Sequence, residues 1–189
     1  GLALYELSLG ALAAAFSGLT ETAFREQVVY EQALTHLEVA TVHYRRAEIE
    51  ASRAAMIRYR DILNALLTEN GSTPTYVTDL AMAENNLGAL SFAEGDSEQA
   101  EVHFRAALNG ALAMLGLQPD DWNTQGLVAG IEIWLGNLAE GRGDLASASE
   151  HYENALGRQQ ALTRFDPSPD NREALARYLT IASVANREA

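Results

Sequence analysis

The stretch from Asn86 to Leu108, NLGALSFAEGDSEQAEVHFRAAL, decides the fold. It predicts two amphipathic helices joined at Gly95-Asp96, because apolar residues recur at helical spacing on both sides of a turn-forming glycine. The same pattern returns 48 residues later. So many matches at one offset indicate an internal repeat. The matched positions are Leu87-Gly88 with Leu135-Gly136, Gly95-Asp96 with Gly143-Asp144, Ala100 with Ala148, His103 with His151, Phe104 with Tyr152, Ala107-Leu108 with Ala155-Leu156, and Pro119 with Pro167.

The composition predicts a helical globular chain. Apolar residues make up 48% of the 189 residues, alanine and leucine dominate, and there are only four prolines. No run of about 18 apolar residues occurs, so we expect no membrane span, and no basic region precedes the first apolar residues as in a secretion signal. The chain begins at Gly1 without a methionine, as a fragment of a longer protein or a tag remnant would. Cysteine is absent, which excludes disulfides and thiolate sites and suits the cytoplasmic location that we expect.

Negative charge is concentrated in the middle of the chain. The net charge is −13, and residues 66–157 hold 14 carboxylates against two cations, Arg105 and Arg142, a net of −12. Such a region repels phosphate backbones and anionic lipid surfaces. We therefore expect neither nucleic-acid nor membrane binding.

The rest of the chain extends the repeat in both directions. Neither glycine nor proline occurs from Leu19 to Asn70, although a single helix of that length is improbable in a compact domain. A shift of 45 residues aligns Ala55 with Ala100 and Tyr59 with Phe104, and it places a degenerate turn near residues 47–51, unless one helix runs straight through. Asp170 is positioned to cap the last helix. The expected divisions of one domain spanning 1–189 are repeats at about 1–34, 35–70, 76–116 and 124–164, then a final helix at 171–187.

These residues resemble the tetratricopeptide repeat family. The family pattern of Leu-Gly, a Gly-Asp turn, a small alanine, an aromatic residue and Ala-Leu is matched twice, as given above. The resemblance implies an all-α fold, a right-handed superhelical stack of antiparallel helix pairs with about 3.5–4 repeats. It also implies that Gly88 and Gly136 permit close approach of the paired helices, and that Phe104 and Tyr152 fill the space between one repeat and the next.

The chain departs from the family pattern in two respects. Glu84 and Glu132 stand where an aromatic residue is usual, and the period is 45–48 residues rather than about 34. We therefore expect a long-repeat variant. In this family the first helices line a concave groove that holds a peptide. The groove positions that the resemblance implies here are Met82, Asn85, Asn86, Ala89, Phe92, Ile133, Asn137 and Glu140.

The sequence gives little sign of catalysis or metal binding. His103 and His151 share one repeat position, which indicates a structural role, and His36 and His43 lie seven residues apart, too wide for a helical zinc pair. No phosphate-binding loop or nucleophile elbow occurs, and Asp96 and Asp144 are best explained as N-caps. We expect no enzyme activity, no metal and no cofactor.

The leading prediction is a protein-protein interaction module that binds a neutral or basic peptide or protein in the groove. One alternative is an effector-sensing or peptide-sensing regulatory segment of a larger bacterial signalling or transcription protein. Another is a helical small-molecule-binding protein or enzyme. Self-association stays open, because the chain starts with an apolar segment and ends with one helix of a new repeat.

Overall fold

The computed structural model describes residues 21–71 and 73–188 of the protein, and within them the fold is all-α, as predicted. The chain divides into two compact units, Gly1–Tyr76 and Val77–Ala189, and each is treated separately below. Residues 1–20 of the first expected repeat, which include the apolar segment at the start of the chain, lie outside the described residues. The seven helices are α2 (Glu21–Arg45), α3 (Ile49–Asn70), α4 (Pro74–Ala93), α5 (Ser97–Leu117), α6 (Trp122–Gly141), α7 (Leu145–Phe165) and α8 (Pro169–Glu188).

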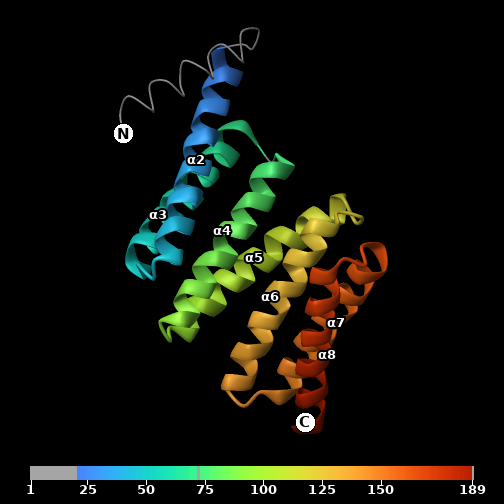
Figure 1. Cartoon of the computed structure of the whole chain (residues 1–189). Helices are drawn as coiled ribbons and strands as arrows, with labels where there is room; N and C mark the ends of the chain where they lie inside the picture. Colours follow the sequence, from blue (N-terminus) through green and yellow to red (C-terminus); the bar gives the residue numbers. More distant parts are fainter. Residues whose placement is uncertain (1–20, 72, 189) are drawn as a thin grey trace. The chain divides into compact units, whose positions relative to one another are not determined.

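The first unit contains the hairpin of α2 and α3 (Figure 1). The chain turns at residues 46–48, so the helix breaks where the degenerate turn was expected rather than running through. Ala47 has a φ of 58°, and the backbone N–H of Glu48 donates to the His43 carbonyl at 2.9 Å. Helix α2 runs without interruption through residues 34 and 35, the expected boundary between the first two repeats.

The same turn closes the next two helix pairs. Gly95 and Gly143 have φ values of 82° and 77°. The following N–H groups, of Asp96 and Asp144, each donate at 3.0 Å to the carbonyl five residues earlier, as Glu48 does at the first turn. The side chains of Asp96 and Asp144 accept hydrogen bonds from the backbone N–H groups of Gln99 at 3.0 Å and Ser147 at 3.1 Å. The two predicted N-caps are therefore confirmed.

The three turns are 48 residues apart, so the 45-residue alignment of the first pair is wrong. Ala47, Gly95 and Gly143 are equivalent, and Ser52 rather than Ala55 occupies the position of Ala100. The alignment failed because it matched the largest side chains, Tyr59 and Phe104, whereas the buried positions themselves keep one spacing. The equivalent buried positions of α3, α5 and α7 are Ser52, Ala100 and Ala148; Met56, Phe104 and Tyr152; Tyr59, Ala107 and Ala155; and Leu63, Ala111 and Gln159.

A glycine faces an aromatic ring in both pairs of the second unit. A Cβ atom added to Gly88 would lie 2.7 Å from the ring of Phe104, and one added to Gly136 would lie closer still to the ring of Tyr152. Real Cβ contacts are not this short, so only glycine fits against each ring. The close approach implied by the family resemblance is therefore present.

The second unit continues as successive packed helices. Helices α5 and α6, α6 and α7, and α7 and α8 are neighbours (Figure 1), consistent with an α-solenoid of helix pairs. Phe104 packs with Leu135 and Leu138 between α5 and α6. Tyr152 packs with Ala139 of α6 and Ala182 of α8. Each ring thus contributes to contacts on both sides of its own helix.

Two helix starts differ from the expected positions. Helix α6 begins at Trp122, because Asp121 accepts hydrogen bonds from the Asn123 N–H at 3.1 Å and the Thr124 hydroxyl at 2.6 Å. Helix α8 begins at Pro169, so Asp170 lies inside its first turn and is not the cap. None of the helices in residues 21–71 and 73–188 is long and apolar enough to cross a membrane.

Candidate functional site

The expected groove residues form one face on each of two first helices, here called the first-helix face. On α4 they are Met82, Asn85, Asn86, Ala89 and Phe92, and on α6 they are Ile133, Asn137 and Glu140. Asn85, Ala89 and Phe92 are spaced i, i+4, i+7, and so are the three residues of α6, which places each set along one side of its helix. Under the 48-residue repeat, Asn85, Ala89 and Phe92 are equivalent to Ile133, Asn137 and Glu140.

Phe92 is engaged by an aromatic residue that the sequence did not single out. Its ring lies 5.2 Å from that of Trp134, and Trp134 stacks on Phe104 with 5.5 Å between centroids and 7° between planes. Both Phe92 and Trp134 are partly buried against the core between α5 and α6. Trp134 is the repeat equivalent of Asn86, so the 48-residue offset contained the signal for it. The face therefore has an aromatic surface where α4 meets α6.

Asn137 and Glu140 come together at the hydroxyl of Tyr152. This hydroxyl lies 2.7 Å from Glu140 Oε2 and 2.9 Å from Asn137 Oδ1, and its single proton is shared between these two acceptors. Burial raises the pKa of Tyr152, and the hydrogen bond to the Glu140 carboxylate raises it further. The phenol stays protonated and holds two acceptor groups in place at the end of α6. Glu140 itself is exposed.

The other face residues have different surroundings. Ala89 packs against the core between α5 and α6, and Ile133 packs against the cluster that contains Tyr152 and Ala182. Met82 is 38% exposed and Asn86 is partly buried. Asn85 is partly buried, and its Oδ1 atom is buried with no hydrogen-bond partner among the described residues.

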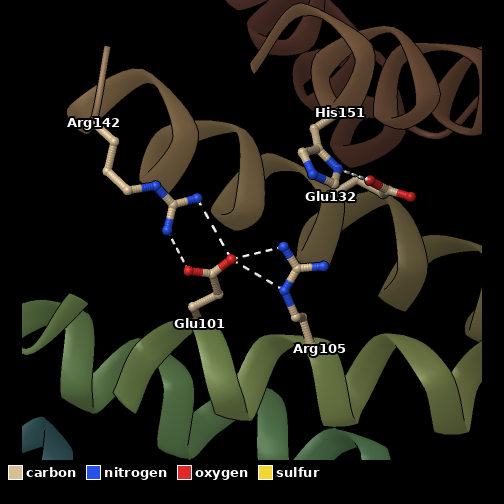
Figure 2. Close-up of polar contacts among 5 residues, drawn as sticks. All are labelled: Glu101, Arg105, Glu132, Arg142 and His151. Atoms are coloured by element: carbon tan, nitrogen blue, oxygen red, sulfur yellow. Dashed lines mark hydrogen bonds and ion pairs between the residues drawn. The ribbon is translucent and has the colours of Figure 1, made fainter. Parts of the chain in front are cut away.

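The two histidines at one repeat position each bind a carboxylate. His103 Nδ1 lies 2.6 Å from Glu84 Oε2, and His151 Nδ1 lies 2.6 Å from Glu132 Oε2 (Figure 2 shows the second pair). The Glu132 side chain is only 7% exposed. These carboxylates stand at the positions that depart from the tetratricopeptide pattern, and each forms a polar pair between a first and a second helix. The sequence contained a signal for these pairs, because a glutamate stands 19 residues before each of the two histidines.

The cations of the acidic region are both bound to one carboxylate. Glu101 accepts hydrogen bonds from Arg105 at 2.7 and 3.0 Å, and Arg142 bridges from the turn after α6 to the same carboxylate (Figure 2). The Arg142 guanidinium, and secondly that of Arg105, hold the pKa of the Glu101 carboxyl below its usual range. Arg105 and Arg142 are the only arginines in residues 66–157, which contain no lysine. Both arginines of that region thus bind the same carboxylate, which carries a single negative charge.

The described residues contain no cluster of three or more histidine, aspartate or glutamate side chains that could hold a metal ion.

Comparison with known proteins gives resemblance at the level of helical repeats alone. No protein-family model matches the chain, and no curated protein matches it. The crystal structure of a de novo designed helical repeat protein, DHR64, aligns with a TM-score of 0.41 and 15% identity, covering 95% of this chain and 89% of that one. A filament described as DHF58 aligns with a TM-score of 0.40 and 16% identity, covering 96% and 88% of the two chains.

Proposed function

We propose that the protein is a non-catalytic interaction module of the tetratricopeptide type, in a 48-residue variant, which binds a peptide or protein along the first-helix face. Support for the family comes from the repeated turn and from the glycine-ring contacts at Gly88 and Gly136. These are the positions at which the family pattern was matched in the sequence. Helical repeats of this kind present extended surfaces to their partners.

The observation that carries the proposal is the group formed by Asn137, Glu140 and Tyr152. Its acceptors are fixed by hydrogen bonds, and the carboxylate lies on an exposed residue at the helix end. Such a group suits donors from a partner, either main-chain N–H groups or basic side chains. The Phe92–Trp134 pair on the same face supplies apolar surface for a side chain of the partner.

Charge supports a neutral or basic partner. A tail rich in carboxylates needs cations on the face that receives it, and both arginines of the acidic region are already bound to Glu101. An acidic partner would therefore meet a region of net negative charge, in which residues 66–157 hold 14 carboxylates against two arginines.

A structural role for the Glu-His pairs supports the non-catalytic assignment. A carboxylate on an imidazole nitrogen is also the arrangement of many catalytic sites. Here, however, the pair occurs twice at one repeat position, where it joins the first and second helices of its own pair. A contact that repeats with the fold is more simply a packing contact.

The test compares fluorescent peptides of equal length that carry basic, neutral or acidic side chains, with binding measured by anisotropy. The informative variant is Glu140→Gln, because the amide oxygen still accepts from the Tyr152 hydroxyl while the charge is removed. We expect basic peptides to bind about two- to fivefold more weakly to this variant, and neutral peptides to be unaffected. The matched control is Glu153→Gln, an exposed carboxylate on α7, which should change nothing. Exclusive binding of acidic peptides would refute the proposal.

A further inference from the structure

A hollow lies away from the first-helix face, between the start of α6 and the loop that joins α7 to α8. Its volume is about 390 Å³, and its lining includes Trp122, Leu162, Phe165, Asp166 and Asp170. None of these residues was assigned a role above as part of the first-helix face. The lining combines two aromatic rings with two carboxylates.

The aromatic part is a stacked pair at the helix ends. The rings of Trp122 and Phe165 are 4.5 Å apart at their centroids and inclined by 19°. Phe165 nevertheless remains 62% exposed, although a large apolar side chain at a helix end gains by being covered. The exposed ring of Phe165 therefore leaves aromatic surface open to a ligand at the border of the hollow.

The charged part is supplied by the loop. Asp166 is held in place, because its Oδ1 accepts from the Ser168 N–H at 3.2 Å and its Oδ2 accepts from the Asn171 side chain at 2.8 Å. Asp170 is exposed, and the structure describes no hydrogen bond or ion pair for it within residues 73–188. Of the described residues that line the hollow, none is a cation. Arg164 lines a different hollow, with Leu175, and its Nε donates to the Gln160 carbonyl.

We propose that this hollow binds an arginine side chain of a protein partner. A guanidinium is flat, stacks on aromatic faces with tryptophan the strongest, and forms paired hydrogen bonds with carboxylates. The hollow is lined by each of these partners: the Trp122–Phe165 stack, and Asp166 with Asp170. The proposal is independent of binding at the first-helix face, because the two surfaces share no residue.

The chain contains two tryptophans, Trp122 at the hollow and Trp134 beside the first-helix face, so its nitrogen-proton spectrum has two indole signals to follow. The signals are assigned with Trp122→Phe. The probes are N-acetylarginine methylamide and its citrulline analogue, which has the same shape without the charge. We expect the arginine probe to shift the Trp122 signal saturably, and the citrulline probe to shift it much less.

Asp170→Asn should weaken binding of the arginine probe about fivefold, and Phe165→Ser should weaken it about threefold. The control Glu173→Gln, an exposed carboxylate on the same helix, should leave binding unchanged. Asp170 is exposed, so its variant tests the site without disturbing the core. Equal shifts with both probes, or an unchanged affinity in Asp170→Asn, would overturn the inference. A shift of the Trp134 signal alone would also overturn it, while supporting binding at the first-helix face.

Discussion

Ala47 takes the left-handed backbone conformation at the turn position that Gly95 takes one repeat later, with φ values of 58° and 82°. An alanine in this conformation costs about 1 kcal/mol, because its Cβ approaches the following carbonyl oxygen. The first turn therefore forms despite its sequence. Packing of α2 against α3, including the buried hydrogen bond from the Ser52 hydroxyl to the Ala40 carbonyl at 2.9 Å, compensates the strain.

Ala47→Gly should stabilise the protein by about 1 kcal/mol, since glycine adopts a positive φ without that contact. Gly95→Ala should cost about the same amount, because no atom lies within 4 Å of the added Cβ and only the backbone is strained. Urea unfolding followed by circular dichroism measures both changes. A loss of stability in Ala47→Gly would contradict the assignment of this turn.

Gly136→Ala should destabilise the protein by about 1–3 kcal/mol, because the new methyl group would overlap the ring of Tyr152. Gly130→Ala is the matched control on the same helix, with no atom within 4 Å of its Cβ. It should instead stabilise the protein by about 0.5–1 kcal/mol through helix propensity.

The first helix pair suggests how the loss at Gly136 can be recovered. There the equivalent positions are Ala40 and Met56, an alanine opposite a flexible side chain. Combining Gly136→Ala with Tyr152→Met should therefore cost less than the sum of the two single changes, as measured in a double-mutant cycle. Strict additivity would show that the methyl group and the ring do not compete for the same space.

Tyr76 should make stability fall at high pH. Burial, and secondly its hydrogen bond to Glu26 at 2.9 Å, raise the pKa of Tyr76 to about 12 from a usual value of 10.0. The folded state thus holds the phenolic proton more tightly than the unfolded state. This contribution is complete below about pH 10 and is lost as the pH rises toward 12, with a magnitude on the order of 2 kcal/mol.

The check is urea unfolding at several pH values from roughly 8 to 12, the range in which tyrosine side chains titrate. Tyr76→Phe should have lower stability near neutral pH and a smaller decline above about pH 10. A decline of the same size in both proteins would assign the alkaline loss to other groups, among them Tyr152 and Tyr178, whose pKa values are also raised by burial.

Asn85→Leu should raise stability by about 1 kcal/mol, because it removes a buried oxygen that lacks a hydrogen-bond partner within the described residues. Thermal unfolding measures the change. Asn109→Leu, at an exposed position on α5, is the control and should stay within about 0.5 kcal/mol of the parent. If Asn85 contacts a bound peptide, the stabilised variant should also bind peptides more weakly.

Most of the fold could be predicted because small residues occupy the positions that define the repeat. Gly88 and Gly136 each face an aromatic ring that leaves no room for a Cβ, and the positive φ of the turns after α4 and α6 favours glycine, so these positions keep their identity in both pairs. The first helix pair was misaligned with the later pairs because Ala47 stands at the position of the turn glycine. Its core also exchanges sizes, with Met56 and Tyr59 where the second pair has Phe104 and Ala107.

The surroundings of the face residues could be predicted less well. A helical pattern assigns a residue to one side of its helix, but it does not say how far the neighbouring helix covers that side. Phe92 is partly covered by Trp134, and Ile133 packs against the cluster that includes Ala182. The Glu-His pairs join different helices, so their distance depends on how the helices pack rather than on spacing within either one.

The binding of two arginines by Glu101 also bears on how copies of this protein meet. Regions with an excess of carboxylates, such as residues 66–157, repel one another, and the repulsion weakens as salt shortens the screening length to about 8 Å at physiological ionic strength. Contacts between two acidic regions should therefore be promoted by salt, whereas contacts with a basic partner should be weakened by it. We therefore expect high ionic strength to favour self-association and low ionic strength to favour binding of a basic partner.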